Sequence, residues 1–275
     1  MSKTIVLTGA GGVLCGTLAK ALAKQGHNVA LLDLRKEAAD EIANVIKADG
    51  GKAIGVAANV LEKESLQSAK KEVNDAFGDC DILINGAGGN HPLGTTSNTH
   101  LLESDLENKA EGFKTFFDLD TNGIKFVFDL NFIGTLLPTQ VFAEDMIGKE
   151  GCSILNISSM NAFTPLTKIP AYSGAKAAIS NFTQWLAVHF SKVGIRVNAL
   201  APGFFLTDQN RSLLTNTDGS LTPRGNQIID QTPMGKFGEP EDLIGTTLWL
   251  CGEGASFVTG VVVPIDGGFS AYSGV

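Results

Sequence analysis

A tyrosine and a lysine four residues apart, Tyr172 and Lys176, are the residues of this chain best suited to proton transfer. At that spacing on a helix the two side chains share one face. A nearby ammonium favours the charged form of a phenol, so we expect Lys176 to lower the pKa of Tyr172 from its usual ~10. The phenol would then serve as an acid or base nearer neutral pH. Because this pair also occurs on ordinary surface helices, its meaning depends on the rest of the chain.

A glycine-rich turn, TGAGGVLCG over residues 8–16, lies between the first β-rich run and the first helical pattern. Glycines let a pyrophosphate approach the backbone, and the next helix offers unpaired N–H groups at its start. By itself the turn could be a simple tight connection. We expect the cofactor to contact Gly9, Gly11, Gly12, Val13 and Leu14.

Asp33 ends the second β-rich run. A carboxylate there can accept hydrogen bonds from both ribose hydroxyls of an adenosine and would repel a 2′-phosphate, which favours NAD over NADP. Arg35 could offset part of that repulsion, and the alternative role of Asp33 is a helix N-cap.

Alternating β-rich and helical patterns predict a Rossmann-type α/β fold, a doubly wound parallel sheet with helices on both faces, in one domain over residues 1–275. The expected strands are 4–8, 29–33, 53–57, 82–85, 152–158, 196–200 and 261–265. The expected helices are 14–25, 37–48, 62–77, 124–147, 171–192 and 240–251. Two polar segments interrupt the alternation, an insertion at about 89–123 and a substrate-loop region at about 203–238.

Composition excludes several classes of function. The net charge of −8 argues against nucleic acid and anionic membrane surfaces as partners. The four cysteines are widely spaced, which predicts reduced thiols in a cytoplasmic protein. No apolar run approaches the ~20 residues that span a bilayer, and no residue cluster has metal-ligand spacing.

The chain resembles the short-chain dehydrogenase/reductase family over nearly its whole length. The matching motifs stand in order: the turn at 8–16, Asn59-Val60, Asn85-Gly86-Ala87-Gly88, Asn131, Ser159, Tyr172-x-x-x-Lys176 and Pro202-Gly203. Ser159 precedes Tyr172 by the family's interval of 13 residues, which favours it over Ser158.

The resemblance implies a catalytic set and further cofactor contacts. Tyr172 would be the general acid/base, Lys176 would bind the nicotinamide ribose, and Ser159 would orient the substrate. Asn131 would hold a water that links Lys176 to solvent. The implied cofactor contacts also include Asn59, Val60, Asn85, Gly86, Ala87, Pro202, Gly203, Phe205 and Thr207, together with Tyr172 and Lys176.

Two positions depart from the family pattern T-G-x-x-x-G-x-G, because Val13 and Cys15 replace its last two glycines. The path of this loop is therefore open. A further departure is Asn85-Gly86, where the family usually carries two asparagines.

Within the family the chain looks like the bacterial D-mannonate oxidoreductases (fructuronate reductases), which implies interconversion of D-fructuronate and D-mannonate with NADH, and a homotetramer. A sugar acid needs a cation and hydrogen-bonding groups, and the candidates are His91, Asn161 and Arg211, with Asn90 and Lys168 behind them. Alternatives are a gluconate 5-dehydrogenase-like or other polyol or keto-acid enzyme, a 3-oxoacyl enzyme, and a catalytically silent nucleotide-binding regulator.

Overall fold

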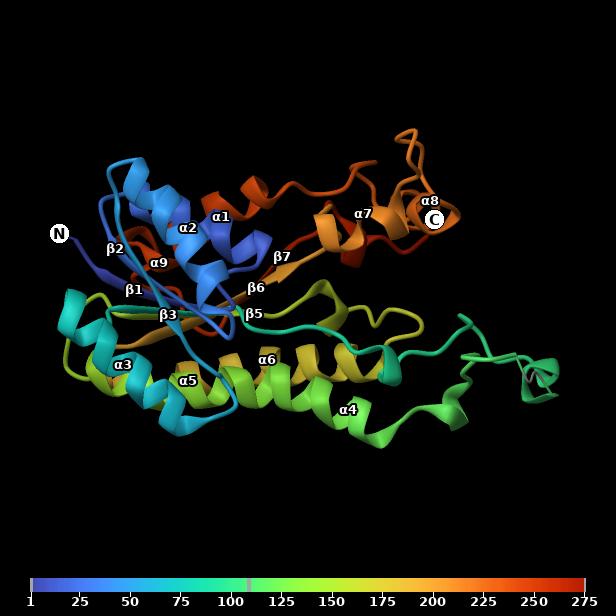
Figure 1. The fold of residues 1–275 in the computed structure, drawn as a ribbon, viewed down its shortest axis with the longest axis horizontal. Helices are drawn as coiled ribbons and strands as arrows, with labels where there is room; N and C mark the ends of the chain where they lie inside the picture. The colour runs from blue at the N-terminus through green and yellow to red at the C-terminus, as the bar shows by residue number, and fades with distance from the viewer. Residues whose placement is uncertain (1, 108–109, 275) are drawn as a thin grey trace.

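Seven parallel strands form one sheet in the order β3-β2-β1-β4-β5-β6-β7 (Figure 1). The computed structural model describes residues 2–107 and 110–274. The strands are β1 (Thr4–Thr8), β2 (Asn28–Asp33), β3 (Lys52–Ala57), β4 (Ile82–Asn85), β5 (Ser153–Ile157), β6 (Arg196–Pro202) and β7 (Val262–Ile265). The strand order reverses between β1 and β4, and such a reversal opens a crevice at the carboxyl ends of the strands.

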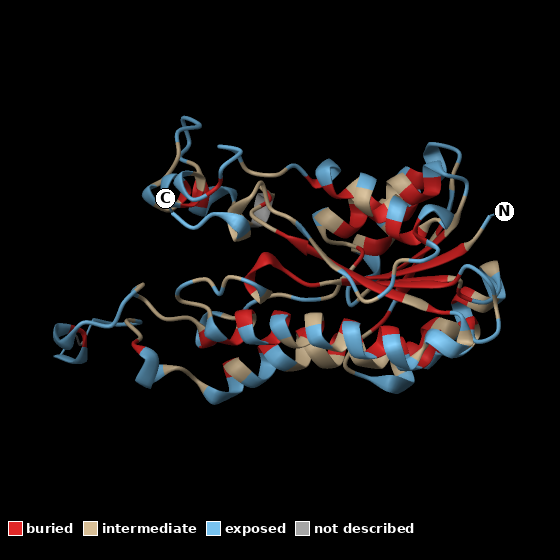
Figure 2. Ribbon diagram, turned by 180° about the vertical axis from the view of Figure 1, so that it is seen from behind, coloured by how far each residue is buried: buried red, intermediate tan, exposed pale blue. Residues whose placement is uncertain are grey.

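Helices cover both faces of the sheet (Figure 1). One face carries α1 (Val13–Lys24), α2 (Lys36–Ala48) and α9 (Ile244–Cys251), and the other carries α3 (Lys63–Phe77), α4 (Thr121–Phe128), α5 (Gly134–Phe142) and α6 (Pro170–His189). The buried residues concentrate in the strands and on the inward helix faces (Figure 2). The predicted Rossmann-type fold is confirmed.

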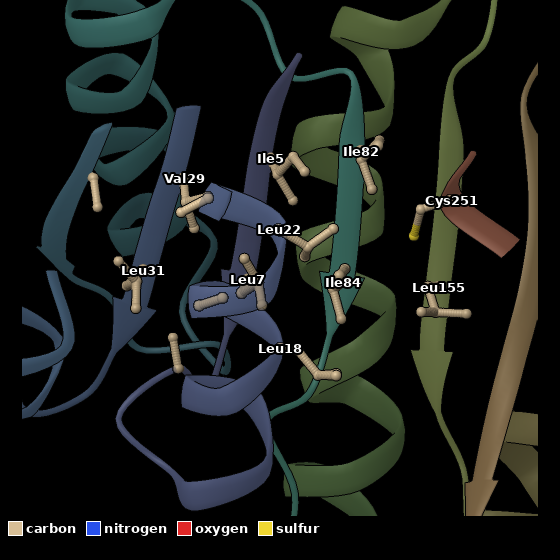
Figure 3. Packing of buried hydrophobic residues seen from close by; sticks show 14 of the residues in the cluster. Ile5, Leu7, Leu18, Leu22, Val29, Leu31, Ile82, Ile84, Leu155 and Cys251 are labelled. Atoms are coloured by element: carbon tan, nitrogen blue, oxygen red, sulfur yellow. The ribbon is translucent and has the colours of Figure 1, made fainter. Parts of the chain in front are cut away.

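Alternate residues along each strand point to opposite faces of the sheet and pack into two separate hydrophobic cores. Leu18 and Leu22 of α1 pack over Ile5 and Leu7 of β1 on one face (Figure 3). On the opposite face Val6 belongs to the core shared with α3, α5 and α6. The strands are thus buried on both sides, as parallel strands usually are.

The predicted helix 124–147 is a continuous rod with a change of geometry in its middle. A π-helical turn, Asp129–Ile133, separates α4 from α5, and a 3-10 turn, Ala143–Met146, ends the rod. The stretch Thr121–Met146 is long and apolar enough to cross a membrane. Half of its most apolar window is buried inside the protein, and a core helix passes the same test, so this is weak support for a membrane span.

The two polar segments contain short helices that the sequence pattern does not predict. The segment 203–238 holds α7 (Asp208–Leu214) and α8 (Pro223–Asp230). The insertion holds three 3-10 turns, Pro92–Gly94, Glu103–Glu107 and Phe116–Asp118, and projects beyond α4 away from the sheet (Figure 1).

Candidate active site

A cleft of about 490 Å³ lies at the carboxyl ends of the strands. The loops after β1, β4, β5 and β6 line it, and Asp33 and Tyr172 both face it. Of the predicted residues it gathers Gly9, Gly11, Gly12, Val13, Leu14, Asp33, Gly86, Ala87, Ser159, Tyr172, Lys176, Pro202, Gly203, Phe205 and Thr207. One cavity therefore joins the expected adenosine end to the expected proton-transfer end.

The glycine-rich turn leaves the start of α1 open to an anion. Gly12 caps this helix with no side-chain hydrogen bond, and the first turn carries no acidic residue. Gly9 has φ of +64°, and a Cβ there would lie 2.8 Å from the Cα of Ala87. A helix N-terminus without a side-chain cap leaves its backbone N–H groups and its positive dipole end free for a pyrophosphate. The residues present therefore fit a dinucleotide.

Asp33 ties this turn to β2. Its carboxylate accepts hydrogen bonds from the backbone N–H of Gly11 (3.0 Å) and of Arg35 (3.0 Å). Arg35, and not Asp33, is the N-cap residue of α2. Asp33 therefore faces the cleft as an acceptor rather than serving as the N-cap.

Two of the departures from the family pattern, Cys15 in the turn and Gly86 after β4, lie against each other. A Cβ on Gly86 would overlap the Sγ atom of Cys15, which is 6% exposed. The thiol thus occupies the volume that a side chain at position 86 would need. The larger residue at 15 and the glycine at 86 are therefore complementary.

Helix α6 presents Tyr172 and Lys176 to the cleft. Lys176 is 3% exposed, its ammonium donates to the carbonyl of Ile157 (2.8 Å), and it lies 5.5 Å from the centre of the Tyr172 ring. Ser158 turns its hydroxyl away toward α6, where it donates to the Lys176 carbonyl (3.0 Å). The hydroxyl of Ser159 turns the other way, toward the Pro202 carbonyl (3.5 Å), where it also influences Tyr172.

The expectation that Lys176 lowers the pKa of Tyr172 is wrong for this structure. Burial raises the pKa of Tyr172 to about 12, and the hydrogen bond with Ser159 only partly opposes that rise. Burial also lowers the pKa of Lys176 to about 8, against a smaller opposing effect of Cys15. Desolvation by burial sets the direction of both shifts, and the Lys176 ammonium, which bonds the Ile157 carbonyl, does not reverse the rise at Tyr172.

Asn131 stands in the π-helical turn, fully buried. Its amide donates to the carbonyls of Gly89 (2.7 Å) and Val127 (2.7 Å) and accepts from the Gly89 N–H (3.2 Å). A Cβ on Gly88 would lie 2.6 Å from the Asn131 Oδ1 and 3.1 Å from the Lys176 Nζ. The Asn131 amide oxygen and the Lys176 ammonium therefore both lie close to Gly88. Asn131 also stands in a π-helical turn, a feature that often occurs at functional sites.

Three predicted cofactor contacts do not line the cleft. Asn59 bonds locally, to Leu61 N–H (3.1 Å) and Glu62 (2.8 Å), at the start of α3. Val60 is buried in the core beside α5. Asn85 is 1% exposed and bonds Thr139 (3.0 Å) and Asn156 (2.9 Å).

The substrate candidates occupy different settings. Asn161 is 4% exposed and adjoins the site, donating its N–H to the Ser159 hydroxyl (3.3 Å), while its Oδ1 has no partner in the described part of the chain. His91 accepts from Leu93 N–H (3.2 Å) and packs against Phe126. Arg211 is exposed on α7 and already has a partner.

Several residues of the cleft were not expected from the sequence: Cys15, Gly89, Ile157 and Asn210. Cys15 and Gly89 adjoin motifs that were recognised, so their place in those motifs could have indicated them. Phe204 lies within the stretch Pro202 to Phe205 that the family resemblance places beside the nicotinamide, whereas Asn210 lies in the polar segment after β6, where no pattern distinguishes it.

Comparisons with known proteins agree with this architecture. Residues 3–218 match the family described as short chain dehydrogenase. An uncharacterized oxidoreductase of Haemophilus influenzae is 62% identical over 275 residues, all of this chain and 95% of that protein. The uncharacterized oxidoreductase UxuB of Bacillus subtilis is 52% identical, over 99% of this chain and 96% of that protein.

A crystal structure from Haemophilus influenza, provisionally named a D-mannonate oxidoreductase and holding bound NAD, has 61% identity and a TM-score of 0.93. The similarity covers 99% of this chain and 96% of that one. The protein belongs to the short chain dehydrogenase family and is an oxidoreductase of that family.

Proposed function

We propose that the protein is an NAD-dependent reductase of a sugar acid, converting D-fructuronate to D-mannonate. The observation that supports this proposal most directly is that one cleft holds both the Asp33 carboxylate and the Tyr172–Lys176 pair. Asp33 favours NAD because it would repel the 2′-phosphate of NADP. The similarity to the NAD-bound Haemophilus structure supports the same cofactor and this substrate class.

The residues of the site have distinct roles in this proposal. Tyr172 donates its proton to the carbonyl oxygen of the substrate, and Ser159 hydrogen-bonds the same oxygen. Because the pKa of Tyr172 is about 12, the phenol is protonated at neutral pH, as a general acid for ketone reduction requires. Lys176 binds the nicotinamide ribose, and Asn131 completes the path by which Tyr172 regains a proton. NAD(H), when bound, supplies or accepts the hydride.

Asn161 is the substrate contact that the burial pattern supports best. An unpartnered buried acceptor costs free energy, which a substrate hydroxyl would recover by donating to it. His91 and Arg211 stay in the proposal as residues around the substrate, although both already have partners.

We also propose a cytoplasmic homotetramer. Trp185 and Val188 of α6 are 55% and 78% exposed, and Trp249 of α9 and Phe257, in the chain between α9 and β7, are 45% and 103% exposed. Exposed apolar groups of this size favour association with further copies. Light scattering during gel filtration checks this, and a monomer would contradict it.

A steady-state screen of D-fructuronate, D-tagaturonate and 5-ketogluconate, each with NADH and NADPH, tests the substrate. We expect the highest kcat/KM for D-fructuronate with NADH. Faster turnover of 5-ketogluconate would favour the gluconate 5-dehydrogenase-like alternative. No turnover of any keto-sugar acid would support the catalytically silent alternative.

A further inference from the structure

Lys168 has an unusual backbone conformation. Its φ is +73°, and no other non-glycine residue in the described part of the chain has a positive φ. The left-handed region is unfavourable for a residue with a Cβ and costs glycine nothing extra. A lysine at such a position has a conformational free-energy cost that glycine would avoid. This indicates that the lysine side chain has a function.

The base of the insertion holds this conformation in place. The Thr96 N–H donates to the Lys168 carbonyl (2.9 Å), and the Ser97 N–H donates to the Lys114 carbonyl (2.8 Å). Gly94 is buried, and a Cβ on it would lie 3.8 Å from the Cβ of Ala171. The insertion is therefore packed onto the first turn of α6, one residue from Tyr172.

Lys168 also lies close to the proton-transfer end along the chain. The segment leaves the cleft at Ser159 and returns at Tyr172, four residues after Lys168. Four Cα–Cα steps of 3.8 Å limit the separation of the Lys168 and Tyr172 Cα atoms to about 15 Å. A lysine side chain and a six-carbon sugar acid together can bridge such a distance.

The ammonium of Lys168 is available for a ligand. Among residues 2–107 and 110–274 it has no hydrogen-bond acceptor and no ion-pair partner, while its side chain is half-buried. The neighbouring cations are engaged: Lys176 bonds the Ile157 carbonyl, and Lys114 bonds the Pro92 carbonyl (3.3 Å). Arg35 lies at the Asp33 end of the cleft.

We infer that Lys168 binds the carboxylate of the sugar acid and determines specificity for acidic over neutral keto-sugars, an inference that rests on the proposed function. The insertion fixes the Lys168 backbone just outside the residues that line the cleft, from where the side chain would extend to the end of the substrate remote from the reacting carbonyl. A charge-assisted hydrogen bond in a partly buried site is among the stronger polar contacts.

The test compares D-fructuronate with D-fructose, which carries a neutral CH2OH group in place of the carboxylate. Lys168→Gln should raise the KM for D-fructuronate by about tenfold or more and reduce the preference for D-fructuronate over D-fructose by a similar factor. Lys168→Arg should recover most of the affinity, and the Kd for NADH should not change. Lys192→Gln, at an exposed lysine in the 3-10 turn Ser191–Val193 that follows α6, is the matched charge control.

Lys168→Gly gives a readout that does not depend on activity. Glycine relieves the left-handed conformation, so the Tm should rise by about 2 °C while the KM for D-fructuronate rises as in Lys168→Gln. Wild-type affinity in both variants, with the wild type active on D-fructuronate, would overturn the inference and leave the proposed function intact. A wild type inactive on every keto-sugar acid would instead overturn the proposed function, and this inference with it.

Discussion

Substitution of Gly86 by alanine should destabilise the protein through two close contacts, one with a side chain and one with the backbone. The added Cβ would overlap the Sγ atom of Cys15 and lie 2.9 Å from the carbonyl oxygen of Thr8. Overpacking of this kind typically costs about 1–3 kcal/mol of unfolding free energy. The same strand end also positions the cofactor turn, because the Thr8 hydroxyl accepts from the N–H groups of Gly86 (3.1 Å) and Ala87 (3.2 Å).

Cys15→Ala should rescue Gly86→Ala in part, because the close contact with the Thr8 carbonyl remains. This change removes the sulfur atom, whereas the Cβ of residue 15 lies 3.7 Å from the added methyl group, an ordinary contact. Alone, Cys15→Ala should cost about 1 kcal/mol, because it leaves a small cavity. In the double variant the new methyl group fills that space, so the two costs should couple favourably by about 1–2 kcal/mol.

Urea unfolding followed by tryptophan fluorescence measures this double-mutant cycle, and fluorescence titration gives the Kd for NADH in each variant. Cys251→Ala is the matched control, since Cys251 is also buried but lies in α9 near the opposite ends of the strands. Its effect should add to that of Gly86→Ala. Coupling below about 0.5 kcal/mol between Cys15→Ala and Gly86→Ala would refute the complementarity of these positions.

Three further changes test the cofactor and substrate ends. Asp33→Asn should reduce the preference for NADH over NADPH in kcat/KM by about tenfold, equivalent to about 1.4 kcal/mol, and an unchanged ratio would count against Asp33 as the selective group. Asn161→Ala should raise the KM for the keto-sugar acid by about tenfold and leave the Kd for NADH unchanged, whereas wild-type KM would remove Asn161 from the substrate site. Lys176→Met tests the buried ammonium: since its pKa falls from 10.5 to about 8, the folded protein binds fewer protons there than the unfolded chain between those pH values. The unfolding free energy of the wild type relative to Lys176→Met should therefore rise by about 2 kcal/mol from about pH 7 to about pH 9.5, and a flat difference in urea titrations would contradict the lowered pKa.

The sheet could be predicted from the sequence because apolar runs separated by helical patterns have few other arrangements. Every strand was expected within two residues of its observed bounds at each end. The π-helical turn at Asp129–Ile133 could not be predicted, since helix continues on both sides of it and its five residues include no glycine or proline. The helices α7 and α8 are short and polar, so packing rather than periodicity defines them.

In the candidate site too, some features follow from the local sequence pattern and others depend on tertiary packing. The spacing of Ser159, Tyr172 and Lys176 indicated residues that the structure gathers in one cleft, and their catalytic roles stay predictions. The raised pKa of Tyr172 depends on desolvation, which a sequence pattern does not report. The local bonding of Asn59 and the burial of Asn85 likewise follow from tertiary packing.

Proton transfer by Tyr172 is the central claim, and Tyr172→Phe tests it most directly because only the phenolic hydroxyl is lost. We predict that reduction of D-fructuronate by NADH slows by about a thousandfold while NADH binds as tightly as in the wild type. A variant that binds NADH and keeps wild-type turnover would contradict the account.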